Sequence, residues 1–361
     1  VLETLDDYYD FDRTDRHKYC YGRVQNPTVR ILEDKIAALE HGCGALALAS
    51  GMAAASTAVF STIKAGSHVV CLKNAYGPLK DLLTGYCREH MNVETTFVKG
   101  VEVSEFEAVI TDKTDLIVLE SPSSLVFSLQ DIRKVSEIAH AHQAKVYIDN
   151  TYCTPLYQKP LDMGADIVMH TTSKYIGGHS DVIGGMLVTK DPELFAKLLH
   201  NRELFGGIVG PMEAWLMIRG LRTMAARLEQ HQKTAMEVAK FLEEQPMVEK
   251  VYYPGLPSHP QYELMKQQQT GNCGLLSFEL KGTLEQAVKF AESLKIFKIG
   301  VSWGGFESLV FLPHMRLDDQ TCEELGASQR IVRIHCGLEG TESLISDLRS
   351  ALERIYTTYL F

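Results

Sequence analysis

The chain has 361 residues, of which 45% are hydrophobic and 23% charged, and its formal net charge at pH 7 is −10. This composition is ordinary for a globular protein, and the acidic balance argues against a nucleic-acid partner, because phosphate binding needs clustered Lys and Arg. No apolar run reaches the roughly 18 residues of a membrane span, and the eight cysteines form no Cys-x-x-Cys pair, so we expect a cytoplasmic protein with reduced thiols, no membrane contact and no zinc site.

Residues 1–28 are rich in Tyr, Asp and Arg and have little apolar periodicity, which predicts an extended arm. The first seven residues of the arm include three acidic side chains, which a signal peptide would not have. Within it, Tyr21 and Arg23 are two residues apart and would lie on one side of an extended chain. Asn26-Pro27-Thr28 is typical of a helix start, and the apolar spacing then predicts a helix over 29–39.

Short apolar runs alternate with helical segments from residue 45 to residue 189. We predict strands at 45–49, 68–72, 93–98, 115–120, 145–149, 167–169 and 185–189. A Ser-Gly turn and an alanine-rich helix follow the first strand, and Tyr76-Gly-Pro opens another helix. This alternation indicates an α/β domain with a mainly parallel sheet covered on both faces.

The pattern changes beyond about residue 195. Helices are predicted over 211–227, 231–244, 284–294 and 341–355, with strands at 250–253, 274–280 and 331–335. These elements predict a smaller α+β domain. We therefore expect an arm over 1–28, a large domain over 29–226 and a C-terminal small domain over 227–361.

Two predicted strands of the large domain end in residues that carry chemistry. Asp149 ends one strand, and Lys174 follows the next, between the hydroxyls of Thr171 and Ser173 and a pair of glycines. Ligands of open α/β sheets bind outside the carboxyl ends of strands. A lysine there can act as a Schiff-base nucleophile, and a carboxylate can hold a pyridine nitrogen protonated. Together they are the minimum set of residues that catalysis with pyridoxal 5′-phosphate (PLP) requires.

Further residues would complete such a site. Tyr76 offers a flat face for a ring. Amides and hydroxyls that could bind a phosphate come from Ser50, Gly51, Met52, Thr171 and Ser173. Arg333, near the end of a predicted small-domain strand, could bind an amino-acid carboxylate in bidentate fashion.

From about Tyr21 to the C-terminus, these motifs resemble, in order, those of the PLP-dependent enzymes of cysteine and methionine metabolism. The family includes cystathionine γ-synthase, cystathionine β- and γ-lyases, methionine γ-lyase and O-acylhomoserine sulfhydrylases. The resemblance implies an aspartate-aminotransferase-like fold of type I. It also implies a sulfur amino acid as the substrate, and a dimer with shared active sites that pairs into a homotetramer.

The resemblance also implies a role for each matching residue. Lys174 is similar to the lysine that binds the cofactor and moves substrate protons, and Tyr76 to the catalytic tyrosine stacked on the ring. The remaining cofactor contacts implied are Tyr21 and Arg23, from a neighbouring subunit, and Ser50, Gly51, Met52, Ser124, Asp149, Thr151, Thr171 and Ser173. The implied substrate-binding residues are Ser302, Trp303 and Arg333.

Departures from the family pattern bear on the subfamily. Ser124 stands where the family usually has Asn, which puts its contact with the ring hydroxyl in doubt. Trp303 stands where most members have Leu, and together with the segments 120–124 and 178–181 it looks most like one bacterial type of cystathionine β-lyase. Val301 replaces a glutamate of several γ-enzymes, and Pro78 replaces a cysteine of methionine γ-lyases. The segment before Tyr21 is shorter than the family's usual N-terminal segment, so we expect either that the chain is truncated or that the given residues leave part of it out.

We therefore expect a PLP-dependent carbon–sulfur lyase that performs α,β-elimination on cystathionine or related cysteine S-conjugates and releases pyruvate, ammonia and a thiol. The alternative is γ-elimination or γ-replacement. A non-catalytic PLP-fold sensor is a further alternative, against which the presence of Lys174 and Asp149 argues. Scattered histidines without paired-ligand spacing predict no metal site.

Overall fold

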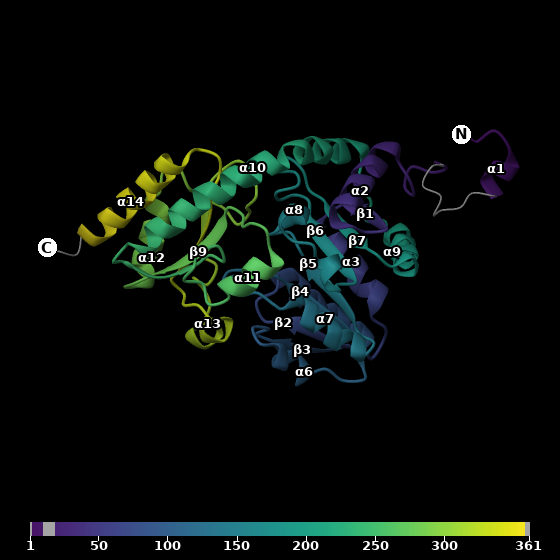
Figure 1. Cartoon of the computed structure of the whole chain (residues 1–361), viewed down its shortest axis with the longest axis horizontal. Helices are drawn as coiled ribbons and strands as arrows, with labels where there is room; N and C mark the ends of the chain where they lie inside the picture. The colour runs from purple at the N-terminus through teal and green to yellow at the C-terminus, as the bar shows by residue number, and fades with distance from the viewer. Residues whose placement is uncertain (1, 10–18, 358–361) are drawn as a thin grey trace.

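The computed structural model describes residues 2–9 and 19–357, which form two sheets, each with its own hydrophobic core (Figure 1). The larger sheet has the order β1-β7-β6-β5-β4-β2-β3. Its strands are β1 (Gly44–Leu48), β2 (His68–Leu72), β3 (Glu94–Val98), β4 (Thr114–Glu120), β5 (Lys145–Asp149), β6 (Ile167–Thr171) and β7 (Gly185–Thr189). Five of them, from β6 to β3, run parallel, and β7 is antiparallel to both of its neighbours. The predicted mainly parallel sheet is confirmed.

Helices lie on both faces of this sheet, as Figure 1 shows. They are α2 (Pro27–Glu40), α3 (Gly51–Thr62), α4 (Gly77–Asp81), η1 (Leu82–Cys87), α5 (Arg88–Met91), α6 (Val103–Glu107), α7 (Ile132–Ala141), α8 (Thr154–Tyr157), η2 (Pro160–Met163) and α9 (Pro192–Phe205). The predicted start of α2 is confirmed, because the Asn26 side chain accepts the backbone N–H of Thr28 at 3.0 Å and Pro27 is the first helical residue.

The smaller sheet has the order β10-β11-β12-β9-β8 and is antiparallel except between β10 and β11. Its strands are β8 (Val248–Tyr252), β9 (Leu275–Leu280), β10 (Lys298–Ile299), β11 (Leu309–Phe311) and β12 (Ile331–His335). Its helices are α11 (Tyr262–Gln268), α12 (Leu284–Ser293), α13 (Asp319–Leu325) and α14 (Thr341–Thr357). The sheet with its helices confirms the predicted α+β arrangement.

Helix α10 (Pro211–Glu243) runs unbroken for 33 residues between the two halves (Figure 1). Its buried hydrophobic residues belong to the core of the large sheet as far as Leu228 and to the core of the small sheet from Ala235 onward. The predicted domain boundary at residue 227 falls inside this helix. The exact division of the chain into domains therefore stays a prediction.

The N-terminal region differs from the extended arm that the sequence predicts. Residues 10–18 lie outside the described part of the chain, and residues Leu5–Tyr9 form a short helix, α1. Tyr21 to Val24 form a turn, in which the carbonyl of Tyr21 accepts the N–H groups of Val24 and Gln25 at 2.9 and 3.0 Å. The prediction of an extended chain at Tyr21 and Arg23 is wrong, because these local hydrogen bonds fold the backbone back.

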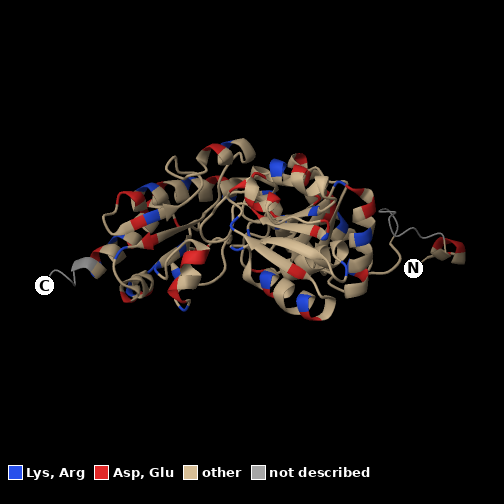
Figure 2. Ribbon diagram, turned by 90° about the horizontal axis from the view of Figure 1, so that it is seen from below, with Lys and Arg blue, Asp and Glu red and all other residues tan. Residues whose placement is uncertain are grey.

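Figure 2 shows Lys and Arg interspersed with Asp and Glu along the helices of both halves. Over residues 2–9 and 19–357, no helix combines the length and the apolar character that crossing a membrane requires.

Candidate active site

The carboxyl ends of β4, β5 and β6 bring the candidate site residues together. Glu120 and Asp149 are the last residues of β4 and β5 and are direct neighbours across the strand pairing. Thr171 ends β6, and Lys174 lies in the turn that follows, its N–H bonded to the Thr171 carbonyl at 3.2 Å. Parallel strands end at one edge of a sheet, so Asp149 and Lys174 share that edge.

A loop of the small half, residues 302–305, closes against Lys174. The Lys174 ammonium donates to Ser302 Oγ at 2.8 Å and lies 5.3 Å from the centroid of the Trp303 ring, a cation–π contact. Gly304 has a φ of +83°, and a Cβ there would lie 3.0 Å from the Lys174 Cα. Only glycine permits this close approach of the loop to the lysine backbone.

The environment of Lys174 makes its ammonium group easier to deprotonate than that of an ordinary lysine. Burial, with the nearby Arg333 guanidinium as the second cause, lowers the pKa of Lys174 from 10.5 to about 8, while Asp149 acts in the opposite direction. Arg333 lies in β12 and donates to the Val301 carbonyl at 2.6 Å. Burial lowers the pKa of Arg333 to about 10, so the group stays cationic at neutral pH.

Asp149 is held by the turn that follows its strand. The Thr151 N–H donates to Asp149 Oδ1 at 2.9 Å, and the Thr151 hydroxyl accepts the Thr171 N–H at 2.8 Å. These two bonds join the ends of β5 and β6. Burial raises the pKa of Asp149, whereas the contacts with Thr151 and the charges of His170 and Lys174 lower it.

Glu120 is a member of the group that sequence reasoning does not single out. It accepts the Tyr76 N–H at 2.8 Å, and it accepts the Ser124 hydroxyl in a second, short bond. Burial and the neighbouring Asp149 raise the pKa of Glu120. The carboxyl thus fixes the backbone of the half-exposed Tyr76, and Ser124 is directed to Glu120 instead of standing free for a ligand.

The start of α3 faces the end of β6. The Ser50 hydroxyl caps α3 by accepting the Ala53 N–H at 3.0 Å, and a Cβ on Gly51 would come within 2.2 Å of Thr171 Oγ1. The helix begins with free N–H groups beside a hydroxyl, which suits a phosphate. Met52 packs against the core, and the Ser173 hydroxyl accepts the Gly184 N–H at 3.1 Å.

Tyr21 and Arg23 are not part of this group. Arg23 donates to the Glu203 carbonyl in α9 at 2.8 Å, and its guanidinium lies 5.4 Å from the centroid of the Tyr21 ring. Arg23 lines a separate pocket with Asn26, Leu46 and Arg202, and that pocket has no lining residue in common with the Lys174 group.

The chemistry of these residues fits PLP. The group has an amine with a lowered pKa, a buried carboxyl at the end of the neighbouring strand, and a glycine that leaves room beside a hydroxyl at a helix start. Among the described residues, no cluster of three or more His, Cys, Asp or Glu side chains is arranged to hold a metal ion.

Comparisons with known proteins agree with this chemistry. Residues 3–353 match the family model described as "Cys/Met metabolism PLP-dependent enzyme". The chain is 38% identical to a cystathionine gamma-lyase of Dictyostelium discoideum, over 93% of this chain and 88% of that one. It is also 38% identical to a cystathionine beta-lyase of Lactococcus lactis, over 93% of this chain and 89% of that one.

A solved structure supports the fold. Cystathionine gamma synthase from Xanthomonas oryzae pv. oryzae superimposes with a TM-score of 0.90 at 34% identity, over 96% of this chain and 90% of that one. Since the identity exceeds 30% and nearly the whole chain is matched, the predicted fold of type I and the predicted cofactor are confirmed. The chain belongs to the PLP-dependent enzymes of cysteine and methionine metabolism.

Proposed function

We propose that this enzyme is a carbon–sulfur lyase that performs α,β-elimination on cystathionine or related cysteine S-conjugates and releases pyruvate, ammonia and a thiol. Lys174, Asp149 and Tyr76 would be its central residues. The observation that carries the proposal is the position of the Lys174 amine, which is bonded to Ser302, lies over Trp303 and is next to Arg333.

The cofactor contacts are assigned by the same proposal. Lys174 would hold PLP covalently, Asp149 would face the ring nitrogen, and Tyr76 would cover the ring. Ser50, Gly51, Met52, Thr171 and Ser173 would surround the phosphate, with Thr151 supporting Asp149. When bound, PLP supplies an electron sink that stabilises negative charge at the substrate Cα.

The chain's own residues would then bind the substrate and move its protons. Arg333 would hold the amino-acid carboxylate in bidentate fashion, with Ser302 and Trp303 closing the pocket. The Lys174 amine, with its lowered pKa, is suited to accept a proton from Cα and to return one later. Glu120 would keep Tyr76 in place through the backbone N–H.

The preference for β-elimination rests on the confinement of Lys174. Elimination at Cβ needs one proton transfer at Cα, whereas elimination at Cγ needs a second at Cβ. An amine held between the Ser302 hydroxyl and the Trp303 ring suits the shorter path. The exposed Val301 side chain, in place of a carboxylate, would recognise the distant ammonium of cystathionine weakly, which favours cysteine S-conjugates with simple thiol leaving groups.

The second candidate is γ-elimination or γ-replacement. It is favoured by the comparisons, because a gamma-lyase and a beta-lyase are equally similar to this chain. The difference between these reactions depends on a few side chains around the leaving group, to which overall identity is insensitive.

We further propose that the enzyme is cytoplasmic and assembles into dimers, and then a homotetramer, in which the partner's arm completes each site. In the described chain, Arg23 binds α9 and not the Lys174 group, as expected of a residue that serves a neighbouring subunit. All eight cysteines are free, which suits a reducing compartment.

The deciding experiment supplies the PLP-loaded protein with L-cystathionine and identifies the 2-oxo acid released. Pyruvate would support the β-lyase, and 2-oxobutyrate would contradict it in favour of γ-elimination. If neither is formed, an activated homoserine ester offered with a thiol tests γ-replacement.

A further inference from the structure

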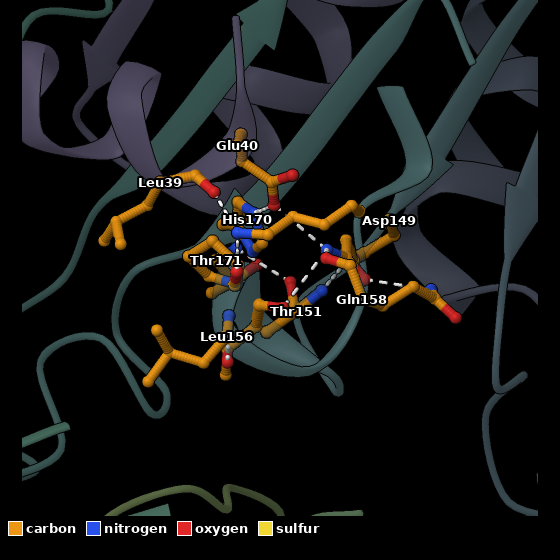
Figure 3. Close-up of polar contacts among 12 residues, drawn as sticks. Leu39, Glu40, Asp149, Thr151, Leu156, Gln158, His170 and Thr171 are labelled. Atoms are coloured by element: carbon orange, nitrogen blue, oxygen red, sulfur yellow. Dashed lines mark hydrogen bonds and ion pairs between the residues drawn. The ribbon is translucent and has the colours of Figure 1, made fainter. Parts of the chain in front are cut away.

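A buried carboxylate and imidazole lie behind the candidate site. Glu40 is the last residue of α2 and His170 lies in β6, and both side chains are fully buried. Glu40 Oε1 and His170 Nε2 are 2.5 Å apart (Figure 3). Nothing in the proposed reaction uses either group directly.

This pair lies on the opposite face of the sheet from the candidate site. Asp149 is paired with Met169, so Asp149, Met169 and Thr171 point to one face and His170 points to the other. The contacts agree with this alternation. Thr171 faces Gly51 of α3, whereas His170 meets Glu40 of α2.

The pair is joined to a network that spans three strand ends. Asn150 Nδ2 donates to Glu40 Oε1 at 3.0 Å and to the Gln158 carbonyl at 3.2 Å. Gln158 Nε2 donates to Asn150 Oδ1 at 3.0 Å and to the Ser121 carbonyl at 2.9 Å. Figure 3 shows Glu40, His170 and Gln158 close together in this network.

Each strand-end member of the network is the chain neighbour of a candidate site residue. Ser121 follows Glu120, Asn150 follows Asp149, and His170 precedes Thr171. A backbone hydrogen bond of 2.9 Å from the Asn150 N–H to the Met169 carbonyl also joins the end of β5 to β6. A shift of the network would therefore move the site residues on the other face.

The polar contacts of Glu40 fall on one carboxyl oxygen. Its Oε1 accepts from Asn150 Nδ2 and is also the atom next to His170 Nε2. Among the described residues, Glu40 Oε2 and His170 Nδ1 have no hydrogen-bond partner. Burying a carboxyl group and an imidazole is costly, and a buried pair of this kind often contributes less to stability than a well-packed apolar pair would. Stability alone is thus a weak reason for this arrangement.

We propose that Glu40 is a positioning residue of the active site, which acts through His170 and Asn150 to hold the ends of β5 and β6 in the register that PLP binding requires. The inference rests on the proposed assignment of Asp149, Thr171 and Lys174 as cofactor contacts. The influence of His170 on the pKa of Asp149 is consistent with this coupling through the sheet.

The test compares two buried carboxylates in the full-chain protein. Glu40→Gln keeps the size of the side chain and replaces its carboxyl group with an amide. Glu279→Gln is the matched control, because Glu279 is also buried and accepts bonds from Tyr252 and Ser328, but lies in β9 of the small sheet. For each variant, the melting temperature without PLP and the dissociation constant of PLP are measured.

We expect both variants to lower the melting temperature without PLP, and only Glu40→Gln to raise the dissociation constant of PLP, by at least tenfold. An increase below threefold for Glu40→Gln, or an equal increase for Glu279→Gln, would overturn the proposal.

A second pair of variants decides the matter if Glu40→Gln does not fold. His170→Gln keeps an N–H that can donate to Glu40 and should bind PLP within threefold of the unchanged protein. His170→Leu removes the donor and should weaken binding at least tenfold. Equal affinities would refute the positioning role. Failure of the site assignment itself is detected separately, because Lys174→Ala would then still bind PLP covalently.

Discussion

The lowered pKa of Lys174 can be tested before any substrate is added. With a pKa of about 8, about one Lys174 amine in ten is neutral at pH 7, whereas a lysine with the ordinary pKa of 10.5 gives about one in 3000. Only the neutral amine attacks the aldehyde of PLP. We therefore consider the rate at which the PLP-free protein captures PLP supplied at saturating concentration. This rate should rise with pH to a plateau, with the midpoint of the rise near pH 8.

The perturbation is Arg333→Gln. Arg333 is the second cause of the lowered pKa after burial, so its removal raises the pKa of Lys174 towards 10.5 without reaching it. The midpoint should move to higher pH, and because the neutral fraction falls in proportion, capture at pH 7 should slow about tenfold if the pKa of Lys174 rises from 8 to about 9. The assay follows the visible absorbance of the bound cofactor after mixing, at pH values from 6.5 to about 10.

Two comparisons make the result specific. Asp149 raises the pKa of Lys174, so Asp149→Asn should move the midpoint in the opposite direction, to lower pH. Arg330→Gln removes an arginine that pairs with Glu249 in the small half and should leave the midpoint unchanged. An unchanged midpoint in Arg333→Gln, or a midpoint at lower pH, would refute the electrostatic reasoning.

Further outcomes follow from the same contacts. Lys174→Ala should abolish turnover while the melting temperature stays within a few degrees, and retained turnover would exclude Lys174 as the central residue. Arg23→Ala should loosen PLP, and hybrid oligomers formed with Lys174→Ala should regain partial activity if sites are shared; no recovery contradicts sharing. Trp303→Leu should raise the ratio of 2-oxobutyrate to pyruvate formed from cystathionine, and an unchanged ratio would remove Trp303 from the argument for β-elimination. Burial lowers the pKa of His231 to about 4 and of His335 to about 3, so the unfolded chain binds more protons below pH 6.5 and stability should fall from pH 6.5 towards 4. His335→Gln should flatten that decline in thermal melts, and an equally steep decline would exclude His335 as its source.

The large sheet was predictable because its strands are buried on both faces. Continuous apolar runs such as His68–Leu72 and Gly185–Thr189 are stable only in the interior, and their predicted bounds match β2 and β7. Strands β10 and β11 have only two and three residues, too few to show a period. The turn at Tyr21 depends on local hydrogen bonds that alternation does not reveal.

The site was predictable where residue type alone indicates the chemistry. A lysine or an aspartate at a strand end is visible in the sequence, and the structure places Lys174 and Asp149 at one edge. Glu120 and Glu40 were harder to recognise, because a glutamate at an element end is ordinarily a solvated charge. Their burial arises only when distant segments pack together, as Glu40 meets His170 across 130 positions of the chain.

The length and position of helix α10 affect how the protein unfolds. At 33 residues it is about 50 Å long, and its two ends are anchored in different cores. Melting either half would fray the shared helix, and with it the segment from Leu228 to Ala235 where one core gives way to the other. We therefore expect heat to unfold both halves in a single calorimetric transition, although each has a sheet and core of its own.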